Sequence, residues 1–341
     1  MKPTMRSTIL VLFVGALVLA LRPGTAPKLE AQSGSLVLAR YGVVDPKTLP
    51  KIQPGRRRGG RVPFRVPDPA AFRREKQEAE SDTHGPQAGE SAQVNLPSAS
   101  LVSTATGFIG LRFSDTFGFI PPDTQVAAGP DHLFEAVNGH GRILNKSGTV
   151  LSDFDLFTFF AVDIFTDVLS DPIVRYDAVS KRWFVTLVTI ESLFNVGDWR
   201  LAVSTTSNPL DPFVLYIASL EGGFPDFPKL AVNDDKLVLT GNIFTIFSQV
   251  YVGTAFLVAN KADLVAGSST PGSTYFPSPQ GLFTIQPAQG LSSGSTLFMA
   301  ARGTAARRTV VRVWSLNGVP GTATPVTSTT TDLTIKSLPT P

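Results

Sequence analysis

Three aspartates stand at the start of similar segments of the chain. Asp123, Asp171 and Asp226 each lie beside or close to a proline that precedes a run of apolar residues. Carboxylates are hard oxygen ligands, so three of them at one place would bind Ca²⁺ or the hydroxyl groups of a ligand. An aspartate near a proline also starts turns and caps strands without any ligand. What these side chains do therefore depends on whether the fold brings them together.

A second candidate site is the segment from Asn138 to Arg142, in which two glycines flank His140. Two glycines around a histidine favour a tight hairpin, and a flexible loop that leaves Arg142 room to bind a phosphate or carboxylate of a ligand is the alternative. No nucleophile motif accompanies these residues. The chain has no cysteine and three histidines, without the two-histidine spacing of a metal site. Thiol chemistry and disulfides are excluded, and a zinc hydrolase is disfavoured.

Charge is distributed unevenly along the 341 residues. Residues 1–100 hold fifteen Lys and Arg against eight Asp and Glu, for +7, whereas residues 101–341 hold fifteen against nineteen, for −4. The basic character belongs to the first part alone. A mildly acidic remainder gives no electrostatic reason to expect nucleic acid as a partner.

The N-terminus is typical of a secretory signal. Lys2 and Arg6 precede the thirteen apolar residues from Ile9 to Leu21, which are too few to cross a bilayer as a helix. We expect a signal peptide over residues 1–31, cleaved after Ala31, and a secreted protein with no stable membrane span. A signal that is retained as an anchor is the alternative.

Residues 32–104 are rich in Pro, Gly, Arg, Glu and Gln, and five arginines cluster between Arg56 and Arg65. Such a segment lacks the apolar residues that offset the entropy of ordering. The sequence predicts a disordered basic linker there, followed by a folded domain over residues 105–341.

The folded part is predicted to be all-β. Runs of five to eight β-branched and aromatic residues alternate with Gly, Pro, Asn and Asp. Pro122, Pro172, Pro228 and Pro287 mark a loose repeat of about 50 to 60 residues, the length of a four-stranded blade with its loops. One such blade cannot bury both of its faces, so the repeat favours a β-propeller of about four visible blades, in a ring that is incomplete if the chain stops short. A β-sandwich is the alternative, but it does not account for the repeat.

The segment from Asp153 to Val168 contains five phenylalanines and interrupts the pattern of strands. We expect it to connect two blades through a single helical turn and to fill the apolar space between them. An exposed hydrophobic docking loop is the alternative.

These motifs resemble a known group of proteins. The ordered set PPDTQVAAGPDH, DPIVRYDAVSKRWF and FPDFPKLAVNDD is similar to secreted bacterial β-propeller proteins of mostly unassigned function, distantly sialidase-like. The resemblance implies a location outside the bacterial cytoplasm, either extracellular, periplasmic or on the outer cell surface. A sialidase would carry Asp boxes, and this sequence has none.

We expect a monomeric, non-catalytic propeller that binds a cell-envelope glycan or an extracellular protein at the channel mouth. The proposed contact residues are Asp123, Asp171, Asp226, Arg142 and His140, with Ca²⁺ as a cofactor of the three aspartates. A carbohydrate-active hydrolase or lyase that uses carboxylates from different blades is the alternative. Its sign would be a deep acidic pocket with two carboxylates at catalytic separation and a raised pKa in at least one. A purely structural surface module is a third hypothesis.

Overall fold

Antiparallel β-strands make up most of the computed structural model. The chain divides into two units, Met1–Ser33 and Gly34–Pro341, and every described residue lies in the second. The structure describes residues 36–52, 107–112, 115, 121–191, 193–277, 282–290, 292–302 and 310–334. The predicted signal peptide and the arginine cluster therefore lie outside the described residues.

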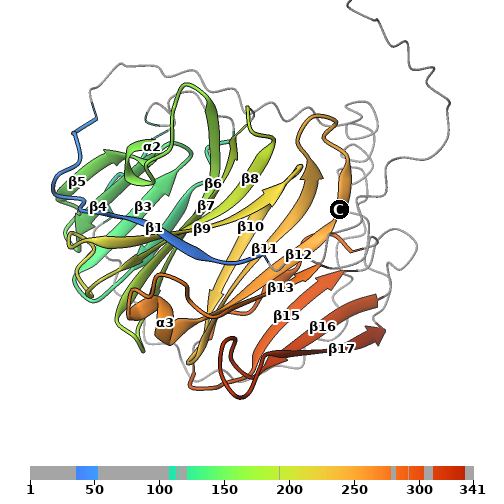
Figure 1. Ribbon diagram of the computed structural model, residues 1–341. Coiled ribbons are helices and arrows are strands. Elements are labelled where there is room, and N and C mark those ends of the chain that lie inside the picture. Colours follow the sequence, from blue (N-terminus) through green and yellow to red (C-terminus); the bar gives the residue numbers. More distant parts are fainter. Residues whose placement is uncertain are drawn as a thin grey trace, which may run out of the picture. The chain divides into compact units, whose positions relative to one another are not determined.

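The strands form four sheets, which we call blades 1 to 4 (Figure 1). Blade 1 consists of β2 (Gln125–Ala128), β3 (His132–Val137), β4 (His140–Asn145) and β5 (Val150–Asp155). Blade 2 consists of β6 (Asp167–Asp177), β7 (Arg182–Glu191), β8 (Val196–Ser204), β9 (Phe213–Glu221) and β1 (Ala39–Val44). Blade 3 consists of β10 (Gly223–Val232), β11 (Lys236–Thr245), β12 (Tyr251–Asn260) and β13 (Ser273–Pro277). Blade 4 consists of β14 (Gln286–Pro287), β15 (Leu297–Arg302), β16 (Val310–Asn317) and β17 (Thr327–Thr334).

The first strand of each blade lies next to the first strand of the following blade. β2 contacts β6, β6 contacts β10, and β10 contacts β14. The blades are therefore arranged around a common axis that their first strands line. This confirms the predicted all-β propeller and its repeat of four-stranded units, each beginning near one of the marker prolines.

Each hydrophobic cluster lies between two neighbouring blades. Along β7, Phe184 and Val188 pack toward blade 3, whereas Trp183, Val185 and Leu187 pack toward blade 1. A strand buried on both faces must be apolar at successive positions rather than at alternate ones. That requirement explains the run WFVTLV in the sequence.

The phenylalanine-rich connection between blades 1 and 2 is as predicted. It contains the single helical turn α2 (Leu156–Phe159), for which the Asp155 carboxylate accepts a hydrogen bond from the Phe157 N–H. Phe154, Phe159 and Phe160 are fully buried in the cluster between the two blades. Filling this space fixes blade 1 against blade 2. These rings form no docking loop, but Phe165 in the same segment is 93% exposed.

One part of the predicted linker is a strand. β1 pairs with β9 and extends blade 2 to five strands, with an irregularity in register between Arg40 and Gly42. Leu38 is fully buried and Val44 almost so. The apolar start of the segment, residues 36–44, thus gains enough burial to order, although the average composition of residues 32–104 indicates disorder. Neither helix in the described part of the chain, each about one turn long, could span a lipid bilayer.

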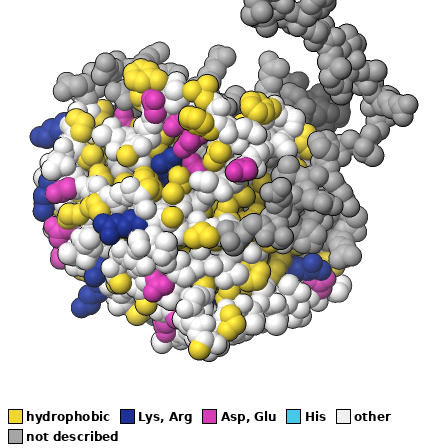
Figure 2. Space-filling model, in the orientation of Figure 1, with side chains coloured by type: hydrophobic (Ala, Val, Ile, Leu, Met, Phe, Trp, Pro, Cys, Tyr) yellow, Lys and Arg dark blue, Asp and Glu magenta, His cyan; other side chains and the backbone are white. Residues whose placement is uncertain are grey.

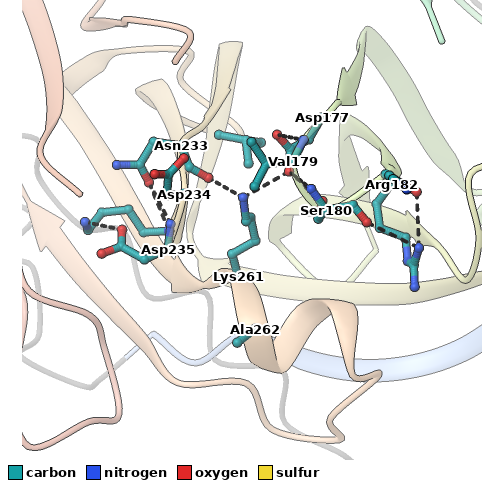
Figure 3. Close-up of polar contacts among 12 residues, drawn as sticks. Asp177, Val179, Ser180, Arg182, Asn233, Asp234, Asp235, Lys261 and Ala262 are labelled. Carbon is teal, nitrogen blue, oxygen red and sulfur yellow. Dashed lines mark hydrogen bonds and ion pairs between the residues drawn. The ribbon is translucent and has the colours of Figure 1, made fainter. Parts of the chain in front are cut away.

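A cluster of polar contacts joins blades 2, 3 and 4 at the strand ends near the helix α3 (Lys261–Val265) (Figure 3). The Lys261 ammonium, 4% exposed, lies 2.9 Å from the Asp177 carboxylate and donates to the carbonyl of Asn233. The fully buried Lys236 bonds to Asp235 and to the carbonyl of Ser295. Figure 1 shows α3 at the lower end of the molecule and α2 at the upper end.

Candidate active site

Bulges at the axis set the positions of two of the predicted aspartates. The strand pairing shifts between Ser170 and Ile173 in β6, and between Asp226 and Lys229 in β10. Each bulge contains a proline, which has no N–H to give to the sheet and is tolerated at such sites. The repeated proline of the sequence therefore marks where an inner strand bends at the axis.

The same backbone conformation recurs once in every blade. Asp123, Asp171, Phe227 and Thr284 all have a positive φ, between 49° and 59°. Residues other than glycine adopt this left-handed conformation rarely, and bulky ones at a real cost in free energy. A strained conformation kept at four equivalent positions indicates a shared structural purpose.

For Asp171, Phe227 and Thr284, that purpose is a hydrogen bond from the backbone N–H to the preceding blade. The Asp171 N–H donates to Asn138 Oδ1 at 2.7 Å, and the Phe227 N–H donates to Asp171 Oδ2 at 3.0 Å. The Thr284 N–H donates to Asn242 Oδ1 at 2.8 Å. The Asp171 carboxyl is thus held between blades 1 and 3.

The three predicted aspartates lie together at the axis. Burial raises the pKa of Asp171 to about 7, and the charges of Asp226 and Asp123 and a hydrogen bond with Asp123 add to the effect. Burial also raises the pKa of Asp226 to about 6, against the opposing effects of the Phe227 N–H and the Lys229 ammonium. The cluster therefore holds protons close to neutral pH.

We expect the proton on Asp171 to make the stability of the protein depend on pH. Between pH about 4 and about 7, folded Asp171 keeps a proton that the unfolded chain has lost, so its contribution to stability falls as the pH rises through this window. Asp171→Asn should raise Tm by a few degrees at pH 8 and leave it unchanged at pH 4. Thermal unfolding followed by circular dichroism measures this, with the exposed Asp131→Asn as the control. An equal shift at both pH values would show that Asp171 is not protonated in the folded state.

A lysine and a phenylalanine border the aspartates. The Lys229 ammonium lies 3.0 Å from the centroid of the Phe227 ring. Burial lowers the pKa of Lys229 to about 8, and the carboxylates of Asp171, Asp226 and Asp123 oppose this shift. The Phe227 side chain is 49% exposed. The site thus offers proton donors, a cation and an open aromatic ring.

His140 and Arg142 belong to a different cluster. His140 begins the strand β4, pairs with Val137 and is 3% exposed, so the predicted tight hairpin is confirmed and the flexible-loop alternative is wrong. Its Nε2 contacts the carboxylate of Asp153, to which Arg142 Nε also donates at 3.2 Å. Burial alone would raise the pKa of Asp153, but hydrogen bonds from His140 and Arg142 outweigh burial and lower it. The five predicted residues therefore fall into two groups, of which only the three aspartates meet at the axis.

Calcium binding by Asp123, Asp171 and Asp226 stays a prediction. Across the part of the chain that the structure describes, no three Asp, Glu or His side chains are placed to hold one metal ion. A proton shared between carboxyls is the simpler way in which this cluster lowers its charge.

Sequence reasoning missed the residues that position the aspartates. Asn138 directly follows the second strand of blade 1 and Asn242 lies near the end of the second strand of blade 3, and each accepts the N–H of the next blade's strained residue. The recurrence of AVN and TGN at these strand ends is a signal that could have revealed them. Lys229 has no such signal, because one lysine after a proline is common on any surface.

Comparisons with known proteins identify related folds. No protein-family model and no curated protein matches the chain. Among solved structures, an exo-β-1,3-galactanase from Phanerochaete chrysosporium shares 12% identity over 62% of this chain and 49% of its own, with a TM-score of 0.34. A polysaccharide lyase shares 12% over 63% and 50%, with a TM-score of 0.38. A GH43 endo-arabinanase from Bacillus licheniformis shares 9% over 57% and 70%, with a TM-score of 0.32.

The chain spans about half the length of the galactanase and of the lyase. At 9–12% identity the likeness concerns the fold alone. All three are named as enzymes that act on carbohydrates, whereas we expected a non-catalytic binding protein; that expectation is corrected, and the enzymatic alternative is the one that we carry into a proposal. The raised pKa values of Asp171 and Asp226 match one part of the sign that we set for the enzymatic alternative.

Proposed function

We propose that the protein cleaves glycosidic bonds by acid–base catalysis at Asp123, Asp171 and Asp226. The observation that carries this proposal is that two of the three carboxyls hold protons near neutral pH, with pKa values of about 7 and about 6. Glycosidic cleavage needs a protonated carboxyl and an ionised one on opposite sides of the same bond. A cluster of carboxyls from three blades, with raised pKa values, meets the first of these needs.

The contacts of each aspartate suggest its role. Asp171 is engaged on both sides, by the Phe227 N–H and by Asp123, so we assign it as a positioning residue. Below pH about 7 it carries the proton of the pair and donates it to the Asp123 carboxylate. Asp226 accepts no side-chain hydrogen bond among those of the described residues, and it is the candidate general acid.

The reaction then balances without a cofactor. The Asp226 carboxyl gives its proton to the glycosidic oxygen as the bond to the anomeric carbon breaks. The Asp123 carboxylate takes a proton from the water whose oxygen bonds to that carbon. Exchange with solvent returns both carboxyls to their starting states.

A glycan outside the cytoplasm is the substrate that fits this proposal best. The N-terminal residues from Lys2 to Leu21 have the pattern of a secretory signal. An exported enzyme meets polysaccharides of the cell envelope or of the surroundings. We therefore place the proposed activity outside the cytoplasm.

The test is release of sugar from a panel of β-1,3-galactan, arabinan and xylan by the full chain, between pH 4 and pH 9. New reducing ends should appear with at least one polysaccharide. The rate should fall above pH about 6 to 7, because Asp226 and then Asp171 lose the protons that the reaction requires.

Asp153→Asn is the matched control, because Asp153 lies in the separate cluster with His140 and Arg142. It should leave the pH profile of the wild type unchanged. A rate that is flat from pH 5 to pH 9, or activity that survives replacement of both Asp171 and Asp226 by asparagine, would contradict the proposal.

A further inference from the structure

Exposed phenylalanines gather at the strand ends that carry the aspartates. They lie in the connections before β6, between β7 and β8, between β11 and β12, and before β14, as well as in the bulge of β10. They are Phe165 (93% exposed), Phe194 (72%), Phe247 (77%), Phe283 (50%) and Phe227 (49%). Figure 2 shows hydrophobic side chains, with acidic ones between them, in the upper part of the view, the end that holds α2 in Figure 1. Apolar side chains that collect on one face indicate a binding surface.

Four rings in blades 3 and 4 form a continuous series. Phe224 stacks on Phe244 with ring centroids 5.8 Å apart, Phe244 lies 5.5 Å from Tyr251, and Tyr251 lies 5.4 Å from Phe283. The series starts two residues before Asp226. It ends at a ring that is half exposed. Phe244 and Tyr251 are partly exposed between them.

Hydrogen bonds fix the middle of this series. The Tyr251 hydroxyl bonds to Thr254 Oγ1 at 2.8 Å and to the carbonyl of Leu282, which adjoins Phe283. An aromatic ring that is already held in place loses little entropy when a ligand stacks on it. The connection that carries Phe283 is thus pinned to blade 3.

Phe227 adds a ring on the side of the aspartates. It has a φ of 50°, and Asp171 accepts its N–H. A bulky residue in this conformation costs free energy, and such residues concentrate at functional sites. Here the conformation leaves a phenyl ring half exposed directly beside the proposed acid.

We propose that Phe227, Phe244, Tyr251 and Phe283 bind successive sugar units of a polysaccharide whose bond is cleaved at the aspartates. Aromatic rings stack on the C–H faces of sugars, and the series extends from the acid across blade 3 to blade 4. A mono- or disaccharide would reach only the first of these rings. The inference deepens the proposed function, on which it rests, because it makes a polymer the substrate.

Binding and cleavage are measured separately to test this. Binding is followed by electrophoresis in gels that contain the polysaccharide cleaved by the wild type, with Asp226→Asn as the parent to prevent turnover. Phe283→Ala in this parent should weaken binding to the polymer by about tenfold. The loss should be smaller for a disaccharide of the same sugar. Phe194→Ala is the matched control and should bind as the parent does, because this ring, 72% exposed against 50% for Phe283, lies on the blade 2 hairpin outside the series.

The outcomes separate the two proposals. If the wild type cleaves a polysaccharide but Phe283→Ala binds polymer as tightly as the parent, the ring series is not a sugar-binding surface and the proposed function stands. If Phe194→Ala weakens binding as much as Phe283→Ala, the whole apolar face acts nonspecifically and the inference fails. If the wild type sediments with phosphatidylcholine vesicles and binds no polysaccharide in the panel, a lipid surface replaces the glycan and both proposals fall.

Discussion

Asp226→Asn should lower the rate of glycosidic cleavage by about 10²- to 10⁴-fold, because an amide cannot donate the proton that the leaving sugar needs. The folded chain should tolerate the change, since the Asp226 carboxyl carries a raised pKa and its charge is not required for folding. Steady-state kinetics on the polysaccharide identified by screening measure the loss. Circular dichroism checks that the variant is folded.

The leaving group distinguishes a general acid from a binding residue. The acidic phenol of an aryl glycoside leaves without being protonated. The Asp226→Asn variant should therefore cleave such a glycoside far better than it cleaves the polysaccharide. Asp171→Asn should behave differently, because Asp171 positions its neighbours. We expect the pH at which the rate falls on the alkaline side to change, and the cleavage rate to drop by the same factor on both substrates. An equal loss on both substrates for Asp226→Asn would show that Asp226 does not act as the acid.

Lys261→Met should cost about 3–5 kcal/mol of folding free energy, the largest stability effect that we expect in this protein. The Lys261 and Asp177 side chains are 5% and 7% exposed and lie 2.9 Å apart (Figure 3). Removing the ammonium leaves the Asp177 carboxylate buried without its partner and the carbonyl of Asn233 without its donor. Unfolding by urea, followed by circular dichroism, measures the difference.

An exposed ion pair supplies the control for this substitution. Lys47 lies 3.0 Å from Asp211, but its side chain is 56% exposed, so Lys47→Met should change stability little. Burial by itself would raise the pKa of Asp177, but hydrogen bonds from Ser180 and Lys261 lower it. The stability that this carboxylate contributes is present above its ordinary pKa and is lost as the pH falls, so the cost of Lys261→Met should shrink below pH about 4. Equal effects of the two lysine substitutions would contradict a buried pair.

The sequence predicts the architecture well because propeller blades are local units. Each strand pairs with its neighbour in the chain, so apolar runs and turn residues within about 50 to 60 residues are enough to indicate a blade. The strand β1 is not predicted by this reasoning, because all of blade 1 and three strands of blade 2 separate it from its partner β9. No local sequence pattern predicts such a pairing.

The candidate site is only partly readable from the sequence, for the same reason. Asp123 and Asp171 occupy equivalent places in the repeat, and Asp226 lies one residue before the equivalent Phe227, so the repeat alone brings the three to one axis. The partners of His140 and Lys261 come from other strands and other blades, so their burial is set by packing that no spacing reveals. The ring series ending at Phe283 likewise depends on which hairpins meet in space.

The pairing of β1 with β9 also determines the order in which the chain assembles. Residues 39–44 are made early, yet their partners are residues 213–217, which follow the whole of blade 1 and three strands of blade 2. Closing so long a loop is entropically expensive and slow, so blade 2 must first form from β6 to β9 and receive β1 afterwards. Leu38 and Tyr41 then pack on blade 2. We therefore expect β1 to dock late in folding and to detach before blade 2 unfolds.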